Sequence, residues 1–274
     1  MKSKKLYINL LVILTFLLGI TIMGYPFFSN WYNQILQNRL ITEYNTSIDT
    51  FSPEAREAEL NESRQYNQKL IQNVMLTDPF DHEAEKITSE EYHKRLNIDH
   101  TNIMGYLTIP KINVKLSIYH GTTPDILDKG VGHLEKTSLP VGGTGTHAVL
   151  SAHSAYAEAT LFNDLVDLKK NDHFYLNILG ENLAYRVDQI KVVSPSNTKD
   201  LAINRNEDYV TLVTCTPHGI NSHRLLVRGT RVPYIEENVE TAPGINWKPY
   251  VILVTLILTA LSLYRKIKKL RSQQ

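Results

Sequence analysis

The stretch TLVTCTPHGINSHRLLVRG, Thr211 to Gly229, decides the fold that the sequence predicts. Two runs rich in apolar and β-branched residues flank a segment with proline and glycine, which is typical of antiparallel strands joined by a turn. If Cys215 lies opposite Arg224, both side chains share one face of the sheet, about 5 Å apart at Cβ. Arg228 shares that face but lies roughly 13 Å further along the strand. We therefore expect Arg224, and not Arg228, to be the partner of the thiol.

The same register pairs further residues. Val213 should lie opposite Leu226, and Thr211 opposite Arg228. A slip of one residue would turn every side chain to the other face of the sheet and would separate the thiol from Arg224.

Short apolar runs between turn residues fill the second half of the chain. The run GYLTIPKINVKLSIYHGT alternates, with Ile112, Val114 and Leu116 on one face, and predicts a half-buried strand. THAVLSAH, HFYLNIL, AYRVDQIKVV, YVTLVTC and RLLVRGTRV predict further strands. In this half only ATLFNDLVDLK, Ala159 to Lys169, has a helical pattern. Many short strands with one or two helices predict a mainly β fold, a closed or nearly closed β-barrel.

The first part of the chain has a helical composition instead. Ser52, Pro53 and Glu54 predict a helix start, with an N-cap, a proline in the first turn and an acid beside it. That helix should continue through EAREAELNESRQYNQKLIQN. The pair Asp78-Pro79 breaks any helix. We therefore expect a helical region and then an exposed irregular segment.

Both ends of the chain carry apolar segments. Leu6 to Phe28 contains no charged residue and follows three lysines, and Trp247 to Tyr264 is followed by RKIKKLR. A bilayer-spanning helix needs roughly 20 apolar residues, and flanking basic residues mark the cytoplasmic side. The alternatives are a cleaved signal peptide, whose apolar region is usually only about 7–15 residues long, and a buried C-terminal helix. We expect two membrane spans, both termini in the cytoplasm and the central domain outside the cell.

These features divide the chain into six parts. They are the cytoplasmic start and first anchor (1–28), an extracellular helical region (29–101) with an irregular segment (76–85), a β-barrel domain (102–235), a linker (236–246), a second span (247–264) and a basic cytoplasmic tail (265–274).

Composition excludes some partners. The chain has 29 basic and 28 acidic side chains, so no bulk charge favours a nucleic acid. No dense carboxylate loop points to a metal ion, and we expect no cofactor. The partner that the apolar ends predict is the lipid bilayer.

Cys215 is the single cysteine of the chain. Extracellular cysteines usually form disulfides, and one cysteine cannot form an intramolecular disulfide, so its position favours chemistry. A neighbouring cation increases the thiolate fraction of a cysteine, and an arginine can stabilise an oxyanion. A general acid or base, normally histidine, is also needed. His218 and His223 lie in or beside the turn, and His153 lies at a strand end; spacing alone does not choose among them.

A family resemblance adds to this. TLVTC followed by an arginine nine residues after the cysteine resembles the active-site signature of sortases, the cysteine transpeptidases of Gram-positive cell surfaces. IPKINVKLSIYHGT and GVGHLEKTSLPVGGTGTHAVLSAH resemble the pilus-building class C sortases, over about Gly105 to Val232. The resemblance implies an eight-stranded closed barrel, with Cys215 as nucleophile, His153 as general acid and base, and Arg224 as stabiliser of substrate or oxyanion.

The resemblance also gives the irregular segment a role. Asp78, Pro79 and Phe80 match the lid motif of class C, in which the aspartate pairs with the arginine and the ring covers the cysteine. A carboxylate would neutralise Arg224, and an apolar ring would keep water from the thiol. An ordinary Asp-Pro turn is the alternative.

The chain departs from the family pattern at two places. The family commonly has a sequence close to Arg-Gly-Leu after the histidine, where this chain has Ser154, Ala155 and Tyr156. His218 stands where an aromatic residue is common. Both differences concern peptide specificity rather than the reaction class.

The function expected from the resemblance is transpeptidation between pilin subunits. An LPxTG-like sorting signal would be cleaved through a thioester on Cys215, and the acyl group would pass to a lysine amine of another pilin. Alternatives are a housekeeping-type sortase that attaches surface proteins to cell-wall peptide, and a non-enzymatic pilus or surface scaffold. The scaffold is disfavoured because no sorting motif precedes the C-terminal apolar run. An L,D-transpeptidase is disfavoured because its usual Ser-His-Gly-Cys run is missing.

Overall fold

The computed structural model describes residues 2–70, 78–80, 90–98, 101–154 and 159–235, together with 251, 254, 255, 257 and 265. The chain divides into two compact units. One comprises residues 1–33 and 244–274, and the other residues 34–243. All of the candidate site residues belong to the second unit.

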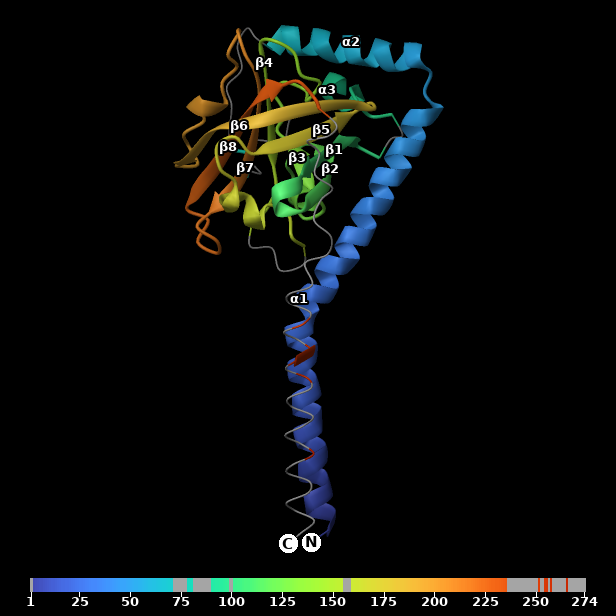
Figure 1. The fold of residues 1–274 in the computed structure, drawn as a ribbon, viewed down its shortest axis with the longest axis vertical. Helices are drawn as coiled ribbons and strands as arrows, with labels where there is room; N and C mark the ends of the chain where they lie inside the picture. Colours follow the sequence, from blue (N-terminus) through green and yellow to red (C-terminus); the bar gives the residue numbers. More distant parts are fainter. Residues whose placement is uncertain are drawn as a thin grey trace. The chain divides into compact units, whose positions relative to one another are not determined.

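In the described residues of the second unit, eight strands close into a barrel in the order β1-β2-β3-β4-β7-β8-β6-β5 (Figure 1). β2 pairs with β3 and β4 with β7 in parallel, and the other neighbours are antiparallel. This confirms the closed eight-stranded barrel. The strands are β1 (Ile103–Ile109), β2 (Val114–His120), β3 (Val131–His133), β4 (Thr146–Ser151), β5 (His173–Ile178), β6 (Glu181–Val193), β7 (Asp208–Thr216) and β8 (His223–Val232).

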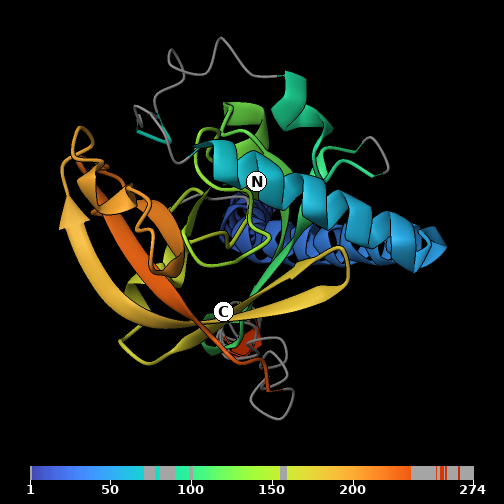
Figure 2. The ribbon, with the colours of Figure 1, turned by 90° about the horizontal axis from the view of Figure 1, so that it is seen from above.

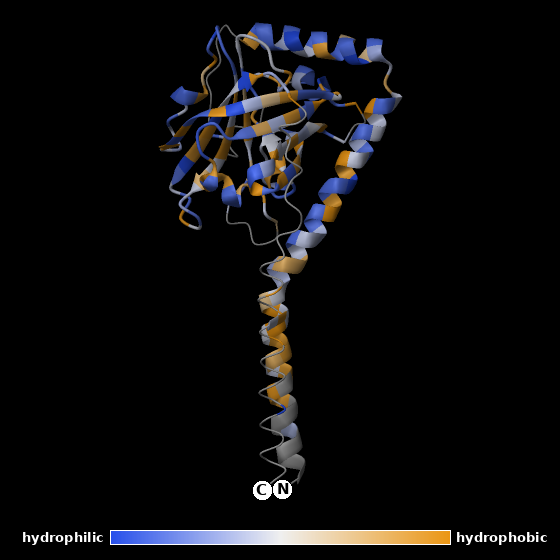
Figure 3. Ribbon diagram, viewed as in Figure 1, coloured by the Kyte–Doolittle hydropathy of each residue, from blue (hydrophilic) through white to orange (hydrophobic). Residues whose placement is uncertain are grey.

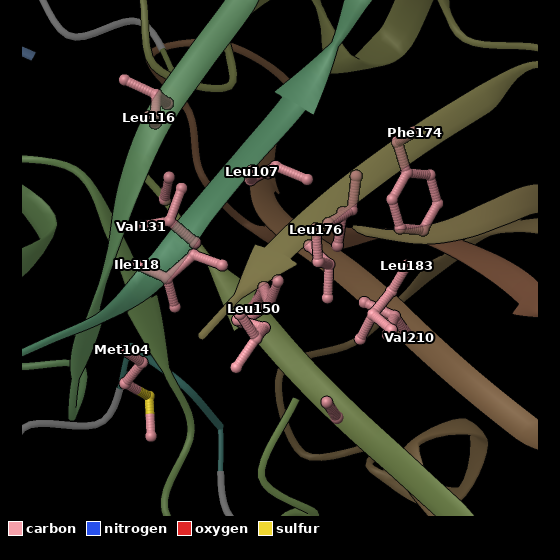
Figure 4. Close-up of a cluster of buried hydrophobic side chains, with 14 of the residues drawn as sticks. Met104, Leu107, Leu116, Ile118, Val131, Leu150, Phe174, Leu176, Leu183 and Val210 are labelled. Atoms are coloured by element: carbon pink, nitrogen blue, oxygen red, sulfur yellow. The ribbon is translucent and has the colours of Figure 1, made fainter. Parts of the chain in front are cut away.

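The barrel interior is an apolar core built by alternate residues of the strands. Figure 4 shows side chains from most of the strands meeting there. The fully buried members include Leu107, Ile118, Leu150, Phe174 and Leu176. Closure of the sheet removes every exposed strand edge. Because side chains fill the barrel interior, a functional site has to lie on the outer face.

A second, smaller apolar cluster lies apart from the barrel core. Its buried members are Leu134, Val149, Leu201, Val213 and Leu226, with Phe80 and Val193 packed against it. Because Leu212 belongs to the main core and Val213 to the small cluster, successive residues of β7 face opposite sides of the sheet. The small cluster therefore covers the outer face of β4, β7 and β8.

The helices precede the barrel or lie in its connections. They are α1 (Lys2–Thr50), α2 (Pro53–Leu70), α3 (Glu90–Lys94) and α4 (Pro124–Leu127), with 3-10 turns η1 (Pro110–Ile112), η2 (Asn163–Asp167) and η3 (Lys199–Leu201). The predicted start of α2 is confirmed, because the Ser52 hydroxyl accepts a hydrogen bond from the backbone N–H of Ala55 at 3.2 Å. α2 runs across one end of the barrel (Figure 2), where buried Asn67 exchanges two hydrogen bonds with the backbone of Leu139.

The part of α1 in the second unit is fixed to the barrel by polar side chains. Gln37 donates from Nε2 to the carbonyl of Lys129 at 2.7 Å, and its Oε1 accepts from the N–H of Ser117 at 2.9 Å. The hydroxyl of Tyr44 donates to the Met104 carbonyl at 3.0 Å. These contacts satisfy backbone groups that the ladder leaves unpaired.

Two sequence predictions were wrong in detail. The alternation through Ile112 is no single strand, because η1 separates β1 from β2 and Asn113 adopts φ 53°. The pattern over Ala159 to Lys169 forms only the 3-10 turn η2, not a longer helix. In both places a turn gives the same spacing of apolar residues, so these side chains pack inward without the predicted strand or helix.

Residues 2–33 belong to α1 and, where Figure 3 colours them, are largely apolar. Large side chains there are exposed, among them Leu11, Leu18 and Ile22. Within the described part of the chain, no helix combines the length and the apolar character that a bilayer crossing requires. The predicted second span and the linker before it lie mostly outside the described residues.

Candidate active site

β7 and β8 pair in the register that the sequence predicts. The partners are Cys215 with Arg224, Val213 with Leu226, and Thr211 with Arg228. Since Val213 belongs to the outer apolar cluster, the period of two places Cys215 and Arg224 on the outer face as well. The thiol therefore lies beside the arginine near the end of β7, with 7% of the residue exposed.

His153 reaches the same place through the parallel pairing of β4 with β7. Ser151 lies opposite Val213, so two further residues bring His153 level with Cys215. The next residue holds this alignment, because the Ser154 hydroxyl donates to the Cys215 carbonyl at 2.6 Å. The structure thus brings together the three side chains expected to form the site.

Arg224 is engaged in hydrogen bonds on all sides of its guanidinium group. Nε and Nη2 donate to the two carboxylate oxygens of Asp78 at 2.9 and 2.5 Å. Nη1 donates to the backbone carbonyls of Asn221 and His223. The Arg224 and Asp78 side chains are only 11% and 14% exposed, so water screens this ion pair weakly.

The ring of Phe80 lies against Arg224 and His153. Its centroid is 4.9 Å from Cζ of Arg224 and 5.8 Å from the ring centroid of His153. Phe80 also packs onto the outer apolar cluster, and Pro79 beside it is buried. The remainder of the expected segment 76–85 lies outside the described residues.

The environment of Cys215 disfavours the thiolate in this arrangement. Burial raises the pKa of Cys215, Arg224 lowers it and Asp78 raises it, with burial the largest cause and a net rise. The carboxylate of Asp78 thus opposes the cation that would activate the thiol.

Comparisons with known proteins agree with this geometry. The family model described as the sortase domain matches residues 107–232. Sortase C-1 of Streptococcus pneumoniae is 44% identical, with a TM-score of 0.67, and the similarity covers 72% of this chain and all of that structure. A further Streptococcus pneumoniae sortase C, described for its pilin substrate specificity, is 41% identical over 72% of this chain and 97% of its own, with a TM-score of 0.67. Sortase A of Bacillus anthracis is 24% identical over 85% of this chain and 97% of its own.

The chain belongs to the sortase family. Its solved relatives at 41–44% identity are sortases C, which confirms the class C resemblance. This sortase is a cysteine transpeptidase.

The other candidate residues of this sortase have different surroundings. Arg228 forms a bidentate ion pair with Asp188 at 3.1 and 2.6 Å and lies 4.1 Å from the ring centroid of Tyr209. His218 and His223 are exposed at the turn. Arg228 is therefore separated from the thiol, as the strand spacing predicts.

Sequence reasoning did not single out two residues, of which Asp128 lies beside His153 and His147 lies away from the thiol, opposite Tyr209. His147 is fully buried, donates from Nδ1 to the Ala202 carbonyl at 3.0 Å and accepts at Nε2 from the Thr211 hydroxyl at 2.7 Å. Burial lowers its pKa to about 4, so this imidazole stays neutral and supports the sheet. Asp128 lies with Oδ1 3.6 Å from Nε2 of His153, and no periodicity or motif in the sequence signals it.

One departure from the family pattern, the segment that follows His153, lies beside Cys215. Ser154 hydrogen-bonds the Cys215 carbonyl, whereas Ala155 and Tyr156 lie outside the described residues. Among the side chains that the structure describes, no group of three or more His, Cys, Asp or Glu is arranged to hold a metal ion.

Proposed function

We propose that this sortase polymerises pilins by acyl transfer through Cys215, His153 and Arg224. The observation that supports this most is the cross-strand pair of Cys215 and Arg224 on the outer face of the barrel, under a covering segment that carries Asp78 and Phe80. The relative described for pilin specificity supports pilins as the substrate class. We infer a C-terminal LPxTG-like sorting signal as the acyl donor and a lysine amine of another pilin as the acceptor.

In the first half-reaction, His153 takes the proton of the Cys215 thiol, and Sγ attacks the carbonyl carbon of the scissile peptide bond. Negative charge moves to the carbonyl oxygen, where the Arg224 guanidinium stabilises it by donating hydrogen bonds. The C–N bond then breaks, His153 donates a proton to the leaving amine, and the acyl group remains on sulfur as a thioester.

In the second half-reaction, the lysine amine attacks the thioester carbon. His153 takes the proton that the amine loses, Arg224 again stabilises the oxyanion, and the C–S bond breaks to regenerate Cys215. The product is an amide between two subunits. The amine has to compete with water, so a covered site favours transfer over hydrolysis.

The covering segment acts as a lid in this proposal. Asp78 accepts hydrogen bonds from Nε and Nη2 of Arg224, and the turn carbonyls accept from Nη1. An oxyanion therefore gains its donors only when Asp78 leaves. Departure of Asp78 also removes one cause of the raised pKa of Cys215, so opening the lid both activates the thiol and frees its partner.

We further propose that the sortase is anchored in the cell membrane of a Gram-positive bacterium, with its catalytic domain outside and both termini in the cytoplasm. The uncharged run Leu6 to Phe28 after basic residues supports this. To test it, protease is added to intact cells that express a chain tagged after Gln274. The central domain should be digested and the tag retained; digestion of the tag contradicts the topology.

The experiment for the proposed function is pilin assembly in cells that carry the Cys215→Ala variant. Covalent ladders of pilin on a denaturing gel should disappear, because no other cysteine can carry the acyl group. Arg39→Ala, at an exposed position of α1 away from the site, is the control and should keep the ladders. Ladders that persist in the cysteine variant would refute the proposal.

A further inference from the structure

An acidic side chain on a separate element lies beside the predicted general acid and base. Oδ1 of Asp128, at the C-terminal end of α4, is 3.6 Å from Nε2 of His153. The Asp128 and His153 side chains are 45% and 28% exposed. A pair this exposed keeps its geometry when substrate binds only if the backbone that carries it is rigid. A base that is oriented by a third group is a recurring arrangement in nucleophilic catalysis.

The backbone under Asp128 is held on three sides. Its own N–H donates to the Pro124 carbonyl at 2.9 Å, and the preceding Leu127 is completely buried. The following residue, Lys129, has its carbonyl fixed by the amide of Gln37, which is itself 5% exposed. The short aspartate side chain thus extends from a fixed position toward the imidazole.

Phe80 also contacts the imidazole, at 5.8 Å between ring centroids, but it belongs to the segment that has to move when substrate binds. Asp128 is part of the connection between β2 and β3, outside the segment that carries Asp78 and Phe80. When Phe80 has left, Asp128 is the carboxylate that still faces His153.

We propose that Asp128 is a positioning residue for His153, which holds the imidazole in its working orientation after the lid opens. The inference rests on the proposed function. With Nε2 turned toward Asp128, proton exchange with Cys215 and with the acceptor amine takes place at Nδ1. Among the described residues with contacts at the site, the other charged groups are Asp78 and Arg224, which pair with each other.

The test compares variants in an Asp78→Ala parent, in which the equilibrium of the proposed lid shifts toward the open state. Asp128→Asn keeps the size of the side chain and removes its charge, and Asp125→Asn removes a charge from the same short helix as a matched control. The readout is the rate of thioester formation on Cys215 with a sorting-signal peptide across a pH series, followed by mass spectrometry.

Asp128→Asn should slow thioester formation by about fivefold. The alkaline limb of the pH profile, which reports the protonated imidazole, should move to lower pH by about half a unit, because the pair is partly exposed. Asp125→Asn should match the parent. An unchanged rate and profile in Asp128→Asn would overturn the inference, and so would a slower rate with an unmoved profile, which indicates a structural role. If the parent itself forms no thioester, the proposed function fails, and the inference fails with it.

Discussion

Removing the carboxylate of Asp78 should make Cys215 react faster. Asp78 binds Arg224 through two hydrogen bonds, at 2.9 and 2.5 Å, and in the proposed lid it helps to hold Phe80 against Arg224 and His153. In the Asp78→Ala variant the segment keeps the packing of Phe80 on the outer cluster but loses the ion pair. The equilibrium between closed and open lid should therefore shift toward the open state.

The size of the shift follows from the contacts. A hydrogen bond to a charged group contributes about 1.5–3 kcal/mol, and both partners here are mostly buried. We take about 2 kcal/mol as the bias that the pair gives to the closed lid after desolvation is offset. Since about 1.4 kcal/mol corresponds to a tenfold change, the open population should rise roughly 25-fold.

The assay is the rate of alkylation of Cys215 by a small thiol reagent at fixed pH. Asp78→Ala should react about ten to thirty times faster than the unchanged chain. Asp188→Ala is the matched control, because it breaks the similar bidentate pair with Arg228 on the same strand and should leave the rate unchanged. Equal rates for Asp78→Ala and the unchanged chain, or the same acceleration in the control, would refute the lid.

Three further predictions follow from the same contacts. The pH at which alkylation reaches half its maximal rate should fall in Asp78→Ala, because Asp78 raises the pKa of Cys215; a pH profile that stays in place contradicts this. Phe80→Ala should also speed alkylation. Phe80→Tyr keeps the ring, so the change in the logarithm of its alkylation rate should be less than half of that in Phe80→Ala. Gln37→Leu should lower the free energy of unfolding by about 2 kcal/mol, measured by urea unfolding, because it removes the partners of the buried N–H of Ser117 and of the partly buried carbonyl of Lys129. An unchanged midpoint would show that these hydrogen bonds contribute nothing.

The register at the site was predictable from the sequence because it depends on local geometry. A turn with proline and glycine joins two runs that both alternate, so pairing Cys215 with Arg224 fixed every other pair along β7 and β8. The alternation predicted through Ile112 fails between β1 and β2, where Pro110 and the left-handed Asn113 form a turn that has the same apolar spacing.

The remaining members of the site depend on contacts between distant segments. His153 lies beside the thiol because β4 pairs in parallel with β7, and spacing along the chain does not contain that pairing. The family resemblance supplied it. Asp128 is found only in three dimensions, since its position follows from the packing of α4 and from the hydrogen bond of Gln37 to Lys129.

Catalysis through Cys215 is tested by mass spectrometry of the intact chain after incubation with a sorting-signal peptide. We expect a mass increase equal to the acyl fragment of the peptide, located on Cys215, removed by hydroxylamine and missing in Cys215→Ala. A chain that stays unmodified even in the Asp78→Ala variant, or an acyl group found on another residue, would contradict the account.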